Sequence, residues 1–307
     1  MKIICNTLDF KINKDTAVAM GKFDGLHLGH REILDEVLEK KSMGLAACVL
    51  TFDPSPAVFF GLSDGKELTT KEEKRAMLEA MGVDILVEFP MTKESASMDP
   101  EQFIRQILVD SMNTKWIVAG KDVSFGKKGA GDEALLRSLS EELGYQVTTI
   151  DKLRIEDKEA SSSYVRSLIE EGKMEEAHKF LGTPYKVAGT VEHGKKLGRK
   201  LGMPTVNLLP AETKLLPPKG VYLSLVTVQG RTYKAISNIG SKPTVSDVPV
   251  IGIESYLYDF DEQIYGEEIE VYLLSYKRSE MRFDSVDALK IQMEKDVSEG
   301  RIFHQIN

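Results

Sequence analysis

The sequence predicts two domains of different class: an α/β domain with a parallel sheet, then an antiparallel β-barrel that ends in a helix. Residues 15–150 alternate between short apolar strand-like runs and helical patterns, which is typical of a parallel sheet covered by helices. Beyond residue 182 strand patterns dominate, punctuated by glycine and proline at intervals that suit a barrel. Gly182-Thr183-Pro184 separates the two patterns, so we expect domains at 1–182 and 183–307.

The amino-acid composition limits the kinds of protein that this chain can be. The 307 residues suffice for two domains, and 42% hydrophobic with 29% charged residues is typical of a soluble globular chain. A net charge of −8 argues against a general nucleic-acid binder. The first residues lack a signal-peptide core, and no apolar run approaches membrane-spanning length. Cys5 and Cys48 lie in apolar surroundings that predict buried free thiols. We therefore expect a cytoplasmic protein without a membrane partner, a monomer or a transient homo-oligomer.

The elements of the first domain follow from periodicity. A continuous apolar run such as 45–52 predicts a strand covered on both faces. Thr70 is a predicted helix cap, and Asp99-Pro100 is a cap followed by proline at the first helical position. The predicted strands are 16–20, 45–52, 83–89, 115–119 and 145–150, and the predicted helices are 70–81, 100–112 and 132–143.

The second domain is predicted in the same way. A helix at 172–181 precedes the boundary, and Asp284-Ser285 opens a final helix with Val286, Leu289, Met293 and Val297 on one stripe. The predicted strands are 185–191, 221–228, 232–239, 251–258 and 269–276.

The most informative stretch of the first domain is Gly-Lys-Phe-Asp-Gly-Leu-His-Leu-Gly-His at residues 21–30, between a buried strand and a helix. Gly21 and Gly25 suit a tight turn with close backbone approach. If His27 and His30 lie in the first helical turn, they share one face beside the free N–H groups and positive dipole end of a helix. Two imidazoles there can donate hydrogen bonds to a phosphate whose charge grows in a transition state. A metal-binding pair or plain surface histidines are the alternatives.

Two further runs suit phosphate. Ala-Ser-Ser-Ser-Tyr-Val-Arg at 160–166 opens a helix with serines that either cap it or hold a phosphate, near the charge of Arg166. Gly-Lys-Lys-Leu-Gly-Arg-Lys at 194–200 is a cationic, glycine-containing loop that suits either a polyphosphate or a solvated turn. Pro-Thr-Val-Asn follows at 204–207 and places two hard oxygen ligands, Thr205 and Asn207, on one side of an extended segment.

The decapeptide resembles the signature of the nucleotidylyltransferases, and its form is closest to the prokaryotic bifunctional riboflavin kinase/FAD synthetase family. Further motifs in both domains extend the resemblance over nearly the whole chain. It implies a Rossmann-like nucleotidylyltransferase domain that makes FAD from FMN, followed by a riboflavin kinase barrel that makes FMN. It also implies ATP, riboflavin, FMN and FAD as substrates or products and Mg²⁺ as cofactor.

The resemblance assigns site residues in the first domain. It implies His27 and His30 as catalytic residues. It implies Asp122 and Phe125, in Gly-Lys-Asp-Val-Ser-Phe-Gly at 120–126, as flavin contacts. The implied ATP ligands are Gly21, Phe23, Asp24, Gly29, Ser161, Ser162 and Arg166. The chain departs from the family pattern at Ser55, where histidine is usual, and at Val123, where phenylalanine is usual.

The resemblance also assigns the second site. The run at 194–207 matches the riboflavin kinase signature, which implies Gly194, Lys195, Gly198, Arg199 and Pro204 as ATP ligands. It implies Thr205 and Asn207 as ligands of Mg²⁺. A carboxylate can accept the proton of an attacking primary alcohol. The residue types alone leave Glu254, Glu262, Glu267, Glu268 and Glu270 as candidates, and the resemblance selects Glu254.

Other functions stay open on the residues alone. A riboflavin kinase with a weakened N-terminal domain would explain the departures at Ser55 and Val123. A different adenylyl- or cytidylyltransferase with an accessory barrel would not phosphorylate riboflavin. A flavin-sensing or storage protein would not consume ATP.

Overall fold

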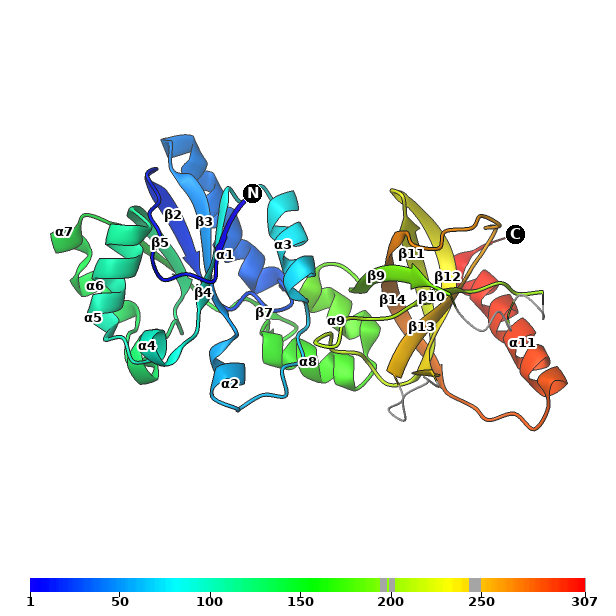
Figure 1. Ribbon diagram of the computed structural model, residues 1–307. Helices are drawn as coiled ribbons and strands as arrows, with labels where there is room; N and C mark the ends of the chain where they lie inside the picture. Colours follow the sequence, from blue (N-terminus) through cyan, green and yellow to red (C-terminus); the bar gives the residue numbers. More distant parts are fainter. Residues whose placement is uncertain (194–197, 199–201, 243–249, 307) are drawn as a thin grey trace. The chain divides into compact units, whose positions relative to one another are not determined.

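The computed structural model describes every residue except 194–197, 199–201, 243–249 and 307. Its contacts divide the chain into two compact units, Met1–Ser162 and Ser163–Asn307 (Figure 1). This division falls before the break at Gly182-Thr183-Pro184 on which the predicted boundary rests. The predicted assignment of residues 163–182 to the first domain stays a prediction.

The first unit is built on a parallel sheet, as the sequence predicts, and its six strands have the order β1-β4-β3-β2-β5-β6. From β2 the chain moves outward through β3 and β4, then returns to the other side of β2 with β5 and β6. The point where the strand order reverses therefore lies between β2 and β5, and open α/β sheets bind ligands at such points. The strands are β1 Lys2–Cys5, β2 Thr16–Met20, β3 Ala46–Asp53, β4 Ile85–Pro90, β5 Thr114–Gly120 and β6 Gln146–Ile150.

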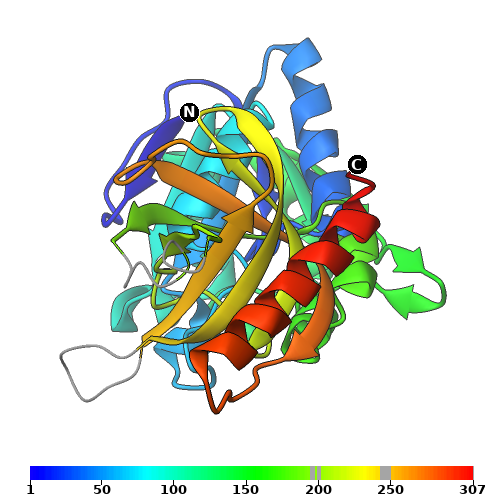
Figure 2. The same ribbon diagram turned by 90° about the vertical axis from the view of Figure 1, so that its right-hand side faces the viewer.

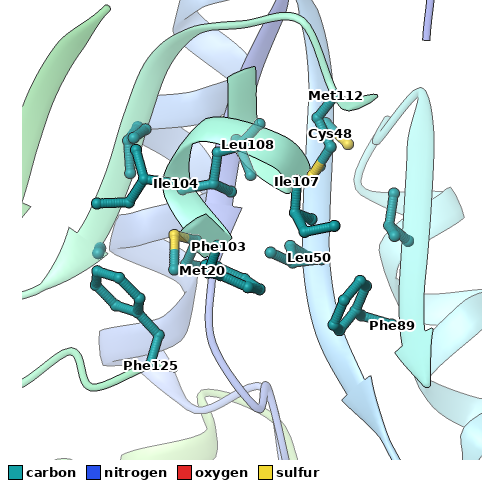
Figure 3. Packing of buried hydrophobic residues seen from close by; sticks show 14 of the residues in the cluster. Met20, Cys48, Leu50, Phe89, Phe103, Ile104, Ile107, Leu108, Met112 and Phe125 are labelled. Carbon is teal, nitrogen blue, oxygen red and sulfur yellow. The ribbon is translucent and has the colours of Figure 1, made fainter. Parts of the chain in front are cut away.

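Helices cover the two faces of this sheet, so alternate residues of one strand enter different cores. Val18 and Met20 face the helical segment at 103–112, whereas Ala17 and Ala19 face α1 (Leu28–Glu39) and α3 (Lys71–Ala80). Figure 3 shows the first of these cores, where Phe103, Ile104, Ile107 and Leu108 pack beside Met20 and Leu50. Burial on both sides explains why the strands read as continuous apolar runs.

The helical segments of this unit begin largely where predicted. Thr70 caps α3 in a capping box with Glu73, and the Asp99 side chain accepts the N–H of Glu101 at 2.9 Å. The predicted helix at 132–143 is interrupted at Leu139. The segments are α1 Leu28–Glu39, η1 Lys40–Met43, α2 Pro56–Phe59, α3 Lys71–Ala80, α4 Lys93–Ala96, α5 Pro100–Gln102, the π-helix Phe103–Ser111, η3 Lys127–Gly129, α6 Glu133–Ser138 and α7 Ser140–Leu143. A hairpin of β7 Arg154–Ile155 and β8 Lys158–Glu159 follows, and α8 Ser162–Glu170 spans the division between units.

The second unit is a closed antiparallel barrel in the order β10-β13-β12-β11-β14-β9, which confirms the predicted class. Its strands are β9 Tyr185–Glu192, β10 Val206–Leu208, β11 Gly220–Val228, β12 Arg231–Lys242, β13 Val250–Leu257 and β14 Glu268–Ser279. Strands β1 and β10 are short and were not predicted. Helix α9, Met174–Leu181, packs on β9 and β14.

The terminal helix α11, Val286–His304, lies across the outside of the barrel (Figure 2). Val297 packs there against Val221, Leu223 and Ile236, and Tyr256 packs against the same three residues. The Ser285 side chain caps the helix by accepting the N–H of Ala288 at 3.1 Å, as its position in the sequence predicts. No helix in the described part of the chain is long and apolar enough to cross a membrane.

Candidate active sites

The decapeptide at 21–30 forms the turn from β2 into α1, at the carboxyl edge of the parallel sheet. His27 is the N-cap of α1, and its Nδ1 accepts the backbone N–H of His30 at 3.3 Å. The two imidazoles stack with ring centroids 3.7 Å apart, so the structure brings together the pair that the spacing predicts. Gly25 has a φ of 83°, and a Cβ there would meet Leu68 Cδ1 at 2.8 Å, so this turn requires glycine.

Both histidines are held in their neutral form. Burial lowers the pKa of His27 to about 4. Burial first, then the charges of His27 and Lys74, lower the pKa of His30 well below its usual value. Because Nδ1 of His27 accepts a hydrogen bond, the proton of the neutral ring is on Nε2, which is then a donor. Nδ1 of His30 is buried and has no hydrogen-bond partner among the described residues. Among the described residues no group of three or more His, Cys, Asp or Glu side chains could hold a metal ion.

The Asp24 side chain stabilises the turn formed by residues 21–30, which we call the signature turn. Its Oδ1 accepts the backbone N–H groups of Leu68 at 2.8 Å and Thr69 at 3.2 Å. The Oγ of Ser162 donates to the Asp24 carbonyl at 2.8 Å. The N–H of Gly25 donates to Thr69 Oγ1 at 3.1 Å. The carboxylate predicted as an ATP ligand thus ties the turn to the segment before α3.

Three other predicted residues lie around the histidine pair. Phe23 is fully buried, and its ring centroid lies 5.2 Å from that of His30. Its side chain therefore packs against the histidine pair from the protein core. A Cβ on Gly21 would meet the Phe23 ring at 3.1 Å. A Cβ on Gly29 would meet His27 at 3.4 Å and the Ala160 carbonyl at 3.6 Å. Glycine at position 21 therefore leaves room for the Phe23 ring, whereas a Cβ at position 29 would make only ordinary van der Waals contacts.

The two predicted flavin contacts lie in different environments. Asp122 follows β5 and is exposed, with its Oδ2 3.3 Å from the Nζ of Lys152. Phe125 is only 3% exposed and packs on Phe103, at the edge of the core in Figure 3. Its ring therefore supports the loop from within. Val123 packs against the same core.

The departure at Ser55 has a local structural role. Its side chain accepts the N–H of Val58 at 3.5 Å and caps the short helix α2.

The side chains of Ser161 and Arg166 are partly buried, and each has an interaction with another group.

In the barrel, strand register brings Asn207 and Glu254 together. Asn207 of β10 lies directly opposite Glu254 of β13, and Glu254 lies directly opposite Asn238 of β12. Directly opposite residues share a face of the sheet, so the three side chains form a polar row across three strands. Asn207 is 6% exposed, whereas Glu254 is exposed to solvent.

Thr205 lies just before β10 and beside Gly198. A Cβ on Gly198 would lie 3.3 Å from Thr205 Oγ1 and well inside contact with the Met203 carbonyl oxygen. The N–H of Met203 donates to the Gly198 carbonyl at 2.8 Å, so the two segments run close together. Pro204 is exposed. The predicted ligands Gly194, Lys195 and Arg199 lie outside the described residues.

Two polar features were missed from the sequence. Asn238 belongs to the polar row just described. Lys74 is 9% exposed, although it is charged. Its signal was available, because it lies one helical turn before the buried Leu78 and therefore on the apolar face of α3.

Comparisons with known proteins match a different family model to each half of the chain. The model of the FAD synthetase family matches residues 9–164, and that of the riboflavin kinase family matches residues 181–304. The bifunctional riboflavin kinase/FMN adenylyltransferase of Listeria monocytogenes is 38% identical over 95% of this chain and 93% of its own length. The protein of the same name from Bacillus subtilis is 36% identical over 93% of this chain and 91% of its own.

A solved structure has a similar fold over nearly the whole chain. It is described as a macrolide-efflux protein from Streptococcus pneumoniae, with a TM-score of 0.86, 31% identity, and coverage of 97% of this chain and 98% of that one. The two family models together with the curated relatives decide the assignment: the chain belongs to the family of bifunctional riboflavin kinases/FMN adenylyltransferases.

Proposed function

We propose that this chain makes FMN and then FAD, one step in each unit. The barrel transfers the γ-phosphoryl group of ATP to the 5′-hydroxyl of riboflavin and gives FMN. The parallel-sheet unit joins the phosphate of FMN to the α-phosphorus of ATP, gives FAD and releases pyrophosphate. The observation that carries this proposal is the presence of a separate polar site in each unit: His27 with His30 after β2, and Asn207 with Glu254 across β10 and β13.

In the kinase step, Glu254 is the general base. Its carboxylate is exposed and accepts the proton of the riboflavin 5′-hydroxyl as that oxygen attacks the γ-phosphorus. Asn207, directly opposite, places a carboxamide oxygen beside it. Lys195 and Arg199 in the run 194–200 are assigned to the nucleotide because this run matches the riboflavin kinase signature.

Thr205 and Asn207 would hold Mg²⁺ in this step. Hydroxyl and carboxamide oxygens are the hard ligands that this ion takes together with ATP phosphates. Gly198 leaves space beside Thr205 Oγ1 that a Cβ would reduce, so the residues present fit such an ion. When bound, Mg²⁺ neutralises charge on the phosphates.

In the adenylyl-transfer step, the histidine pair stabilises charge on the transferring group. Both rings are neutral, and the Nε2–H of His27 is a hydrogen-bond donor at the N-terminus of α1. Ser161, Ser162 and Arg166 are ATP phosphate ligands on the strength of their motif. Asp122, which is exposed, is the flavin contact that we favour, while Phe125 supports its loop from the core. Positioning and charge stabilisation suffice here, so no covalent enzyme intermediate is needed.

Product chromatography tests the proposal. With riboflavin, ATP and Mg²⁺ we expect FMN followed by FAD, and with FMN and ATP we expect FAD and pyrophosphate. A kinase with a weakened N-terminal unit would stop at FMN, and a transferase of another specificity would leave riboflavin unphosphorylated. A flavin-storage protein would consume no ATP. We propose that the reactions take place in the cytoplasm and involve neither nucleic acid nor membrane.

A further inference from the structure

Helix α3 presents three basic residues near the signature turn, and two of them bind carboxylates. Lys71 pairs with Asp53 at the end of β3 and lies 3.4 Å from Glu88 of β4. Arg75 binds Glu88 with two donors, Nε at 2.8 Å and Nη2 at 2.6 Å. These pairs fix α3 across the carboxyl edge of the sheet.

The third basic residue, Lys74, is buried without such a partner. It is 9% exposed, and among the described residues no carboxylate lies within 4.0 Å of its Nζ. Its hydrogen bond goes to the backbone carbonyl of Lys22, inside the signature turn, at 3.3 Å. A buried ammonium whose charge no carboxylate contacts is costly, because a single carbonyl dipole replaces little of its hydration. Such a charge is compensated when an anionic ligand binds beside it.

The charge of Lys74 reaches the histidine pair. It is one of the causes that lower the pKa of His30, after burial and the charge of His27. Burial raises the pKa of Glu67, and the charge of Lys74 lowers it. The nearby carboxylates of Asp24, Asp53 and Glu72 raise the pKa of Glu67 further. Because both imidazoles are neutral, the pair itself brings hydrogen-bond donors but no positive charge.

We propose that the ammonium of Lys74 is a phosphate ligand of the adenylyl-transfer site and contacts the triphosphate of ATP. The inference rests on the proposed function of the first unit. In that reaction an oxygen of the FMN phosphate forms a bond to the α-phosphorus, the bond to the bridging oxygen breaks, and pyrophosphate leaves with the electron pair. Negative charge therefore grows on the leaving group, where a fixed cation stabilises it more than it stabilises bound ATP.

The test uses the full chain and two reactions that belong to this site alone. The forward reaction takes FMN and ATP to FAD, and the reverse reaction takes FAD and pyrophosphate to FMN and ATP. We expect Lys74→Met to raise the KM of ATP and of pyrophosphate and to lower the forward kcat, each by about 10- to 100-fold. Phosphorylation of riboflavin by the barrel is expected to stay unchanged and reports that the variant protein is folded.

Two further variants separate charge from positioning. Lys74→Gln keeps a donor for the Lys22 carbonyl but has no charge, and Lys74→Arg keeps the charge. We expect Arg to recover part of the lost activity and Gln to recover none. Lys71→Met is the matched control, since it removes a cation of the same helix that carboxylates already neutralise, and its KM for ATP should stay within about 3-fold of that of the parent. Full activity of Lys74→Gln would overturn the proposal, because a positioning hydrogen bond would then explain the residue.

A measurement on the unchanged protein keeps the proposal testable if the variants do not fold. Addition of pyrophosphate should shift the NMR signal of the Lys74 side-chain NH₃⁺ group, which is assigned in the unchanged protein by through-bond correlation from the Lys74 backbone amide, and an unmoved signal would refute the contact. Failure of the proposed function looks different: the parent chain would then make no FAD in either direction. A parent that makes FAD alongside an equally active Lys74→Met would refute only the role of Lys74.

Discussion

The Nδ1 of His27 accepts the backbone N–H of His30 at 3.3 Å, while the two rings stack 3.7 Å apart. One imidazole thus caps the helix turn that carries the other. Their orientation is coupled, because neither ring can rotate without loss of the cap or of the stack. The pair behaves as one preformed donor group at the end of β2.

We expect His30→Ala to lower adenylyl transfer by about 10²- to 10³-fold, because a preoriented hydrogen-bond donor to the developing charge is lost. Riboflavin phosphorylation should be unaffected, since His30 belongs to the first unit. FAD formation from supplied FMN is the measurement. His178→Ala, at an exposed position in α9, is the matched control. Undiminished FAD output from His30→Ala would remove this histidine from the mechanism.

Glu254→Gln is expected to slow FMN formation by about 10²- to 10⁴-fold, because the amide cannot accept the proton of the attacking hydroxyl. FAD formation from supplied FMN should survive. Glu262→Gln, an exposed acidic residue outside the polar row, serves as control and should retain both activities. If both steps fell together in Glu254→Gln, the assignment of one step to each unit would be wrong.

The lowered pKa of His27 predicts how the stability of the first unit depends on pH. The folded value is about 4 and the ordinary value is 6.5, so between these values the unfolded chain binds the proton more tightly. Stability should be constant above the ordinary value and fall as the pH falls through this window, by up to about 3 kcal/mol from this group. Urea unfolding at a series of pH values measures it. His27→Gln should flatten the dependence, and an equally steep dependence in that variant would assign it to other groups.

Gly198→Ala is expected to impair the kinase step alone. The added Cβ would collide with the Met203 carbonyl and push on Thr205 Oγ1, which displaces the segment that carries the proposed Mg²⁺ ligands. We expect a loss of about 10- to 100-fold in FMN formation, with FAD formation from FMN retained. Steady-state rates of both reactions from one preparation measure it. Normal FMN formation would show that the close approach has no functional importance.

Ser237→Ala is expected to destabilise the barrel by about 1–3 kcal/mol. Its hydroxyl bonds those of Ser224 and Ser255, each at 2.7 Å, and all three are buried. Removing it leaves two buried hydroxyls without that partner. Thr227→Ala is the matched control, because Thr227 and Thr232 form a similar pair at 2.8 Å on the exposed surface of the same two strands. It should cost less than about 0.5 kcal/mol in chemical denaturation, and equal losses in both variants would contradict the role of burial.

Much of the fold was predictable because the strongest signals are local. The buried strand at 16–20, the capping box at Thr70 and the cap at Ser285 lie where the sequence predicts them. Local signals fail where long-range contacts decide. The short strand β10 gains its partners only when the barrel closes, and Leu139 interrupts a helix whose apolar pattern is continuous. The prediction of a buried free thiol is confirmed for Cys48. Cys5 is only partly buried, because it ends the edge strand β1.

The candidate sites were predictable in residue type more than in role. The spacing of His27 and His30 predicts their shared face, and the structure confirms that they meet. The sequence could not show that the Asp24 carboxylate is bound by two backbone N–H groups, or that Phe125 lies within the core. Those facts depend on segments far away along the chain. The opposition of Asn207 and Glu254 likewise depends on register, which no local pattern encodes.

Closure of the barrel has a consequence for behaviour under stress. Each of the six strands described for the barrel has two neighbours, so none of them is an edge strand. The parallel sheet ends in β1 and β6, which are short and have a neighbour on one side only. Intermolecular strand pairing on partial unfolding would therefore start from the sheet, and heat-induced aggregation should follow the melting of the first unit rather than that of the second.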